Sequence, residues 1–176
     1  MAQQPSYRPL VPSEFFRDGR SARPLVPGTV PRGQARLDSP LYTGRDEKGK
    51  PVEEFPFAMT KDVLARGRER FNIFCSVCHG LDGHGDGRIV QRGFTRPPDF
   101  ATDLSRYYRL RGEKVSLRDA PAGHFFDVIT NGFGAMPDYA EQVPVRDRWA
   151  IIGYIRALQY SQSPEGRARF EKGGKK

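Results

Sequence analysis

Apolar residues recur at helical spacing in three stretches between residues 60 and 160. At the start of the first stretch, Thr60 is suited to cap a helix, because its hydroxyl can accept a hydrogen bond from the first turn. The apolar positions that follow lie three or four residues apart, at Leu64, Gly67, Phe71 and Phe74. This pattern predicts a helix that runs directly into residues 75–79.

Two further helices are predicted downstream. The segment from about Ala122 to Thr130 has apolar side chains on one side and stops before Gly132, a residue that favours helix ends. The segment 146–159 follows Pro144 and carries two adjoining apolar stripes. The stripes are Trp149, Ile152 and Ile155, and Ile151, Ile155 and Leu158. Together the three helices predict a mainly α domain over residues 60–160.

Residues 1–59 show neither helical nor strand periodicity. They hold nine of the 15 prolines, which fix φ and favour extended chain with turns. Large apolar side chains are nevertheless scattered through this part, and a solvated linker would have little use for them. We therefore expect a long irregular N-terminal strap (residues 1–59) that lies on its own domain or on a partner. Residues 161–176 are expected to form a solvated basic tail.

Composition and charge exclude several classes of protein. Lys and Arg outnumber Asp and Glu by 29 to 21, and the resulting net charge of +8 is spread over strap, domain and tail. It attracts acidic surfaces, but no basic run alternates with aromatic residues, so no nucleic-acid partner is expected. No apolar run is long enough for a transmembrane helix, and two cysteines cannot build a disulfide scaffold. No secretory signal is expected in the residues after Met1, which lack a charged segment followed by an apolar run.

The candidate chemistry lies in Cys75-Ser76-Val77-Cys78-His79. C-x-x-C-H is the attachment signature of c-type haem. Two thiols three residues apart on one turn can reach the two vinyl groups of one porphyrin, and the adjacent His79 can then bind the iron. A covalently held porphyrin would also supply much of the hydrophobic core, which explains how only 37% hydrophobic residues can suffice.

Three other interpretations of this segment stay open. A redox-active dithiol is typical of a βαβ setting, whereas helices and glycine-rich loops are predicted here. A zinc site needs four ligands, and their spacing would match no common zinc motif if they were Cys75, Cys78, His84 and His124. The third interpretation is a chance occurrence of the pentapeptide.

Met136 is the candidate sixth ligand of the iron. It lies in the segment 131–137, where glycines allow the backbone to approach a porphyrin and Pro137 stiffens the chain. A thioether ligand favours ferrous iron and so raises the reduction potential. His124 is the rival sixth ligand and would give a lower potential.

The proximal histidine of such a site usually donates its other ring N–H group to a carbonyl. The carbonyl group of Pro97 or Pro98 is the candidate acceptor for His79. The candidates for neutralising the haem propionates are Arg92, Arg96, Tyr107, Tyr108 and Arg111.

Residues 60–160 resemble a class I cytochrome c domain. Besides the C-x-x-C-H segment, the features that carry the resemblance are Gly67, Phe71, Met136, Trp149 and Tyr154. The resemblance implies a fold in which the first and last helices cross, with Gly67 allowing their close approach. It implies one covalent haem c with His79 and Met136 as axial ligands. It also implies a periplasmic location at the outer face of the cytoplasmic membrane, where haem is attached.

A more specific similarity covers most of residues 7–160. The strap segment FFRDGRSARPLVPGTV (15–30), residues 92–94 and the run HFFDVITNGFG (124–134) are similar to the monohaem cytochrome c subunit of bacterial alternative complex III. This similarity implies an electron-transfer subunit of a membrane-bound quinol:electron-acceptor oxidoreductase, without bond-making chemistry of its own.

The implied partners are multihaem cytochrome and iron–sulfur subunits. The implied electron acceptor is a copper protein, a cytochrome c or a terminal oxidase. Members of this family commonly carry a lipoprotein-type N-terminus, which these residues lack. We therefore expect that partner subunits hold the chain at the membrane, or that its N-terminal anchor has been lost. The alternative function is a free soluble periplasmic shuttle cytochrome.

Overall fold

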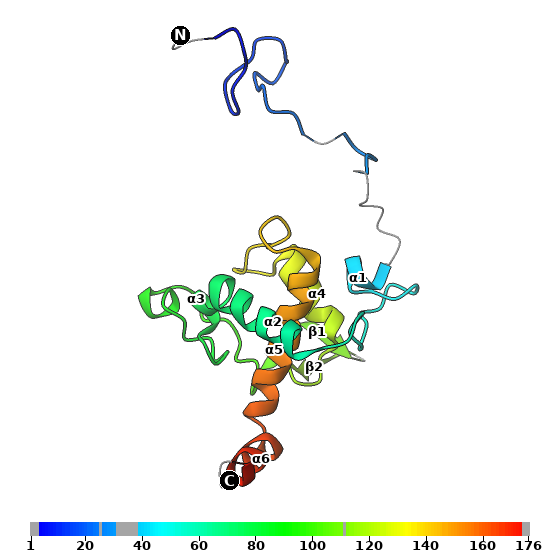
Figure 1. The fold of residues 1–176 in the computed structure, drawn as a ribbon, viewed down its shortest axis with the longest axis vertical. Coiled ribbons are helices and arrows are strands. Elements are labelled where there is room, and N and C mark those ends of the chain that lie inside the picture. The colour runs from blue at the N-terminus through cyan, green and yellow to red at the C-terminus, as the bar shows by residue number, and fades with distance from the viewer. Residues whose placement is uncertain (1–3, 25, 31–38, 111, 174–176) are drawn as a thin grey trace. The chain divides into compact units, whose positions relative to one another are not determined.

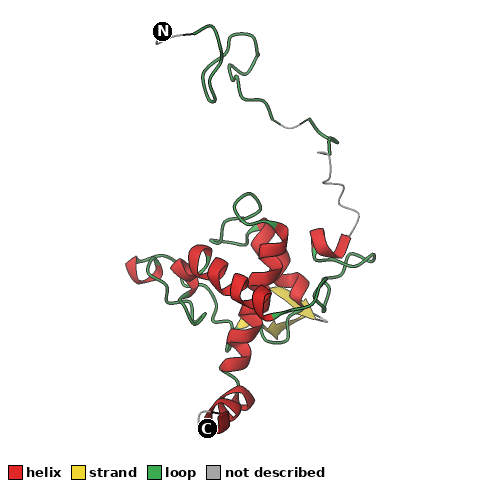
Figure 2. Cartoon of the chain, viewed as in Figure 1, coloured by secondary structure: helices red, strands yellow, loops and turns green. Residues whose placement is uncertain are grey.

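The computed structural model describes residues 4–24, 26–30, 39–110 and 112–173. The chain divides into two compact units, Met1–Leu37 and Asp38–Lys176, and each is described by itself. Regular secondary structure lies in the second unit and is mainly helical, as Figure 2 shows. Within the described ranges, no helix combines the length and the apolar character needed to cross a membrane.

The first unit is folded through short turns. The N–H group of Ser13 donates to the carbonyl of Gly19 at 3.0 Å. Asp18 and Arg23 form an ion pair at 2.7 Å, and the Arg23 guanidinium lies 4.2 Å from the centre of the Phe16 ring. Helix and extended strand are absent from the described residues of this unit, as its proline content predicts.

The C-x-x-C-H segment lies where helix α2 (Lys61–Phe74) gives way to the short helix α3 (Ser76–His79). The hydroxyl of Thr60 accepts a hydrogen bond from the N–H group of Val63 at 3.3 Å, which confirms the predicted cap. Figure 1 shows α3 following α2 directly. Both cysteines and His79 are therefore presented by one helical junction.

Helices α4 (Ala122–Asn131), α5 (Val145–Ser161) and α6 (Pro164–Gly173) complete the C-terminal part. The ends of α4 and α5 agree with the predicted helices within two residues. Gly132 ends α4 with a φ of +73°, a conformation that side-chain-bearing residues rarely adopt. Most of the predicted basic tail is helical in α6, and its described side chains are mainly exposed.

Helices α2 and α5 cross, as Figure 1 shows. At the crossing, Gly67 of α2 lies against Ala150 of α5. A Cβ atom on Gly67 would collide with the carbonyl group of Ala150, so glycine is needed for this close approach. One turn farther along, the rings of Phe71 and Tyr154 pack edge to face with centroids 5.3 Å apart. This is the helix crossing of the class I cytochrome c fold that the sequence predicts.

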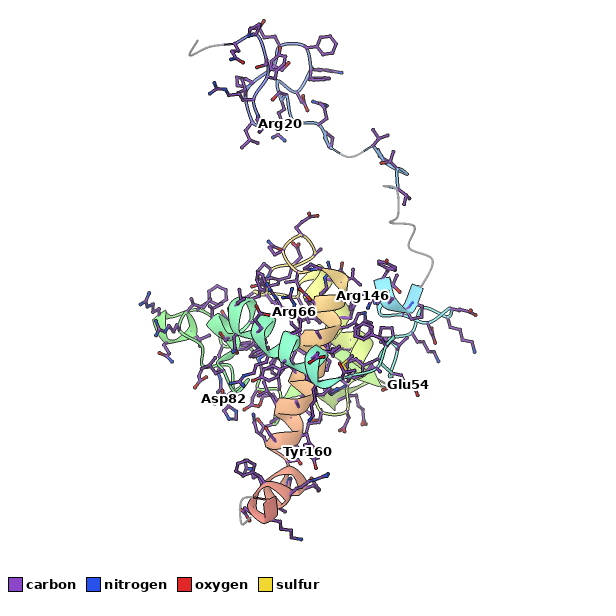
Figure 3. The ribbon with its side chains drawn as sticks, in the orientation of Figure 1. Arg20, Glu54, Arg66, Asp82, Arg146 and Tyr160 are labelled. Atoms are coloured by element: carbon purple, nitrogen blue, oxygen red, sulfur yellow. The ribbon has the colours of Figure 1, made fainter. Side chains whose placement is uncertain are left out.

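A surface ion pair also joins α2 to the start of α5. Arg66, labelled in Figure 3, donates to both carboxylate oxygens of Asp147 at 2.8 and 3.0 Å. The two parallel hydrogen bonds fix the geometry of the pair. Asp147 also lies in the first turn of α5, where the helix macrodipole favours a negative charge.

The chain just before α2 packs on the second unit's own helices. It includes helix α1 (Ser39–Thr43), which shows no helical pattern in the sequence. Nε1 of Trp149 donates to the carbonyl of Leu41 at 2.7 Å. The N–H group of Gly123 donates to the carbonyl of Val52 at 2.8 Å. This part of the predicted strap therefore lies on its own domain, one of the two arrangements that the sequence allows.

Strands β1 (Leu104–Leu110) and β2 (Glu113–Ser116) form a small antiparallel hairpin. The pairing register shifts between Leu104 and Arg109. The hairpin was not predicted, because its irregular, charge-rich strands lack a clear alternation of apolar and polar residues. It precedes Leu117, a buried core residue.

Candidate cofactor site

A cavity of about 350 Å³ lies inside the second unit. Its walls come from α2, α3, α4 and α5, from the segment 94–98 and from the loop after α4, and most of the lining side chains are apolar. This size and lining are typical of a small-molecule or cofactor site. All six residues that the sequence assigns to cofactor binding line this cavity: Cys75, Cys78, His79, Pro97, Pro98 and Met136.

The two cysteines lie together on the cavity wall and are not joined by a disulfide. Burial, with a smaller contribution from Cys78, raises the pKa of Cys75 to about 12, and burial also raises the pKa of Cys78. Both thiols are therefore protonated at neutral pH, unlike the reactive thiolate of a redox dithiol. Across the described ranges, no three His, Cys, Asp or Glu side chains gather closely enough to hold a metal ion, so the zinc interpretation has no assembled site there.

His79 is buried at the end of α3 with its ring at the cavity. Burial lowers the pKa of His79 to about 4, so the imidazole is neutral and able to bind a metal at physiological pH. Nδ1 of His79 is buried and makes no hydrogen bond to any described residue. A neutral imidazole with an unsatisfied nitrogen, beside two thiols in an apolar cavity, fits a covalently attached haem.

Phe100 packs directly on this imidazole. Its ring stacks on that of His79, with centroids 4.6 Å apart and planes at 12°. Phe100 gives no periodic signal in the sequence, and only the fold brings it to His79.

Pro97 and Pro98 lie at the cavity in the segment that follows the short helix η1 (Val90–Arg92). The carbonyl of Pro97 faces Gly85, where a Cβ atom would collide with it. Nδ1 of His79 makes no hydrogen bond to any described residue. The structure therefore does not show the expected hydrogen bond to either proline carbonyl, and that bond stays a prediction.

Only part of the predicted propionate-binding set can be placed. Arg96 lines the cavity, as does Arg106, which the sequence pattern does not single out. Arg92 is exposed at the end of η1. The other three candidates lie outside the described side chains: Tyr107, Tyr108 and Arg111.

Met136 lies in a tight turn after α4. The N–H group of Phe133 donates to the carbonyl of Met136 at 3.0 Å, and the N–H group of Met136 donates back at 3.1 Å. Gly132 packs against the Met136 carbonyl, since a Cβ atom on it would come within 2.6 Å of that oxygen. The turn brings Met136 to the cavity that His79 also lines.

His124, the rival ligand, is buried on α4 and lines the same cavity. Its Nε2 lies 3.2 Å from the hydroxyl oxygen of Ser105. Burial is the main reason why the pKa of His124 falls to about 4. The hydrogen bond to Ser105 engages one of the two ring nitrogens, as is usual for a histidine ligand, so both candidates for the sixth position line the cavity.

A hydrogen-bonded pair of His84 and Asp99 connects two loops beside the cavity. Nδ1 of His84 lies 2.6 Å from Oδ2 of Asp99, and this hydrogen bond raises the pKa of His84. Although burial opposes it, hydrogen bonds from the Ala101 N–H group and from His84 hold the pKa of Asp99 below its ordinary value. Arg96 donates to the His84 carbonyl at 2.7 Å. The loop after the C-x-x-C-H segment is thereby attached to the segment 96–99. The same loop carries Asp82, labelled in Figure 3.

Comparisons with known proteins give a family match and a similar solved structure. Residues 62–155, more than half of the chain, match the family model described as cytochrome c oxidase, cbb3-type, subunit III. No curated protein matches the chain. A chain of the reducing HAO-like protein complex of Kuenenia stuttgartiensis is similar, with 24% identity and a TM-score of 0.45 over 59% of this chain. The match spans 47% of that chain, so less than half of its length is covered.

Proposed function

The chain belongs to the family described as cytochrome c oxidase, cbb3-type, subunit III, a family of class I c-type cytochrome domains with covalently bound haem, and on this basis we propose that it is an electron-transfer subunit. It would pass single electrons as the monohaem cytochrome of alternative complex III, a membrane-bound quinol:electron-acceptor oxidoreductase. When bound, the haem iron supplies the one-electron change between the ferric and ferrous states. The polypeptide itself would make or break no substrate bond.

The observation that carries the electron-transfer role is the convergence of four residues on one apolar cavity. Cys75 and Cys78 supply the two thiols for covalent attachment, and both reach the cavity from one helical junction. His79 supplies a neutral imidazole and Met136 a thioether, the pair of ligands that favours a raised reduction potential. We assign the four residues these roles and expect one haem in the domain.

Membership of alternative complex III is supported by sequence features outside the generic cytochrome motifs. These are the strap segment 15–30 and the run 124–134, which resemble the corresponding segments of that subunit. The partners would be the multihaem cytochrome and iron–sulfur subunits, with a soluble copper protein, cytochrome c or oxidase as acceptor. The proposed location is the periplasmic face of the cytoplasmic membrane, where partner subunits would hold the chain.

The first unit supports attachment to partner subunits. Large apolar side chains are exposed on it, including Leu10 at 88% and Phe15 at 83%. Exposed apolar groups at this density are typical of a binding surface. The backbone of this unit is held by its own hydrogen bonds and by the Asp18–Arg23 ion pair, so it can present these side chains in a defined arrangement.

Purification from membranes in mild detergent tests the proposal. The tagged full-length chain should bring down a haem-rich complex whose haems are reduced by added quinol. Phe15→Ser should weaken this association while leaving the haem spectrum unchanged, whereas Phe170→Ser, an equally exposed change in α6, should not. Native material that runs as a lone cytochrome without detergent or partners would refute membership of the complex.

A free soluble shuttle is the second candidate. It is favoured by the contacts from Trp149 to Leu41 and from Gly123 to Val52, which pack residues before α2 on the domain itself. Limited proteolysis of the isolated protein distinguishes the two functions. Rapid cleavage within residues 4–30 with an intact domain supports a partner-binding strap, and resistance there supports the shuttle.

A further inference from the structure

The Met136 loop (residues 132–144) joins α4 to α5 and carries the proposed sixth ligand. Beyond the turn at Met136, few backbone hydrogen bonds hold it. The N–H group of Tyr139 donates to the carbonyl of Ile129 on α4 at 2.9 Å, and the N–H group of Val143 donates to the carbonyl of Tyr139 at 3.0 Å. The position of the loop relative to the cavity therefore depends on contacts made by side chains.

One side chain, Arg148 in the first turns of α5, binds this loop at two points. Its Nε donates to the carbonyl of Val143 at 2.8 Å, and one terminal nitrogen donates to the carbonyl of Ala140 at 2.7 Å. The other terminal nitrogen donates to the hydroxyl of Thr130 on α4 at 3.0 Å. All three nitrogens of the guanidinium are thus engaged, and they connect the loop to both flanking helices.

The surroundings of Arg148 make this contact rigid. The residue is only 6% exposed, so water competes little for its donors. Its guanidinium lies 5.6 Å from the centre of the Phe126 ring on α4. The helix macrodipole disfavours a positive charge near the N-terminal end of α5. The buried guanidinium is therefore stabilised by the oxygens and the ring that it contacts.

We propose that Arg148 is a positioning residue for the thioether of Met136, an inference that rests on the ligand role proposed above. Methionine has three flexible side-chain bonds and offers a single weak ligand atom, so it stays at the iron only if its backbone is held in place. By fixing the carbonyls of Ala140 and Val143, Arg148 holds the C-terminal half of the loop. A looser loop would leave Met136 displaced in a larger fraction of molecules, and an added ligand would bind to that fraction.

Imidazole binding to the purified ferric haem protein tests the proposal. Arg148→Lys keeps the charge but cannot form the three divergent hydrogen bonds of a guanidinium. It should tighten imidazole binding about tenfold, which is the result expected if the fraction of molecules with Met136 displaced from the iron rises tenfold. The weak far-red absorption band that marks thioether ligation of ferric haem should decrease in parallel. Thr130→Val removes one of the three acceptors and should shift both readouts in the same direction by a smaller amount, which keeps the test available if Arg148→Lys does not fold.

Arg156→Lys is the matched control. Arg156 lies two turns farther along α5, is half-buried and donates to the carbonyl of Arg118 at 2.9 Å and to the side chain of Gln159 at 2.8 Å. It contacts the Phe125 ring but makes no hydrogen bond to the described Met136 loop. Its substitution should reduce stability while leaving imidazole affinity within about twofold of the wild type, since the Met136 loop keeps its anchor.

Met136→Ala separates failure of this inference from failure of the proposed ligand. If the wild type binds imidazole as tightly as Met136→Ala, Met136 is not the ligand and the earlier proposal fails. If Met136→Ala binds imidazole much more tightly than the wild type, but Arg148→Lys and Thr130→Val do not, the ligand assignment stands and the role of Arg148 is refuted. An equal shift in Arg156→Lys would also refute it, because the effect would then be general destabilisation.

Discussion

The ring of Phe100 lies flat against the imidazole of His79, with centroids 4.6 Å apart and an interplanar angle of 12°. Phe100 also packs edge to face against Phe71 on α2 and Phe125 on α4. One side chain therefore links the proposed iron ligand to two helices of the core. This contact restricts rotation of a ring whose Nδ1 makes no hydrogen bond to any described residue.

Replacement of Phe100 by leucine should destabilise the haem protein. Phe100→Leu removes three aromatic contacts and leaves a small void, so the free energy of unfolding should fall by about 1–3 kcal/mol. Guanidinium denaturation followed by tryptophan fluorescence measures it. Phe170→Leu is the control, because Phe170 is 83% exposed on α6. If Phe170→Leu lowered the free energy of unfolding as much as Phe100→Leu, the contact between Phe100 and His79 would not be a specific source of stability.

The crossing of α2 and α5 predicts different costs for adding a methyl group at Gly67 and at Gly153. In Gly67→Ala the new methyl group meets the backbone carbonyl of Ala150, which cannot move aside, and the free energy of unfolding should fall by about 1–3 kcal/mol. In Gly153→Ala the methyl group meets the flexible end of Met59, which can rotate away, so the cost should stay below about 1 kcal/mol. Thermal unfolding of both variants provides the comparison, and the reverse order of stability would contradict the crossing geometry.

Met136→Ala and His124→Ala together identify the sixth ligand. Met136→Ala should lower the reduction potential by on the order of 0.1 V, because the thioether favours the ferrous state. It should also allow carbon monoxide to bind the reduced protein readily. His124→Ala should leave the thioether ligation intact. Potentiometric titration of both variants decides the matter, and an unchanged potential in Met136→Ala would assign the ligand to His124.

The His84–Asp99 pair predicts a pH dependence of stability. The raised pKa of His84 means that its contribution is complete below the ordinary histidine pKa and is lost as the pH rises through the value in the folded protein. The lowered pKa of Asp99 means that its contribution is present above the ordinary aspartate pKa and is lost as the pH falls. The pair should therefore stabilise the fold most between about pH 4 and pH 6.5.

His84→Gln tests this dependence. Because the His84 side chain is 42% exposed, the loss of unfolding free energy should be at most about 1 kcal/mol near pH 5.5. The difference from the wild type should shrink as the pH rises through the folded pKa of His84. Ionisations of the haem itself cancel in this difference. A difference that does not vary between about pH 5.5 and pH 8.5 would mean that the charged pair does not contribute.

The main helices could be predicted because each has a local signal. Thr60 caps α2, Pro144 precedes α5, and Gly132 supplies the positive φ that ends α4. Cys75, Cys78, His79 and Met136 could likewise be chosen as candidates, since spacing and residue type alone define the C-x-x-C-H segment and the downstream methionine, and the structure brings all four to one cavity. The family match over residues 62–155 then confirmed the cytochrome fold.

Contacts between distant backbone groups and side chains could not be predicted. Arg148 binds carbonyl oxygens of Ala140 and Val143, and carbonyl groups are the same whatever side chain a residue carries. The stacking of Phe100 on His79 and the hydrogen bond from Trp149 to the Leu41 carbonyl likewise depend on long-range packing. The hairpin of β1 and β2 lacks a regular alternation, so it gave no strand signal.

The central claim is that one haem is bound covalently to Cys75 and Cys78. Mass spectrometry with peptide mapping tests it most directly, on protein that is purified in its native state and then denatured. A porphyrin bound through thioether bonds survives denaturation, so the mass should exceed that of the polypeptide by one haem. The added mass should map to the peptide that contains both Cys75 and Cys78. A polypeptide mass without haem, or haem that dissociates on denaturation, would contradict the account.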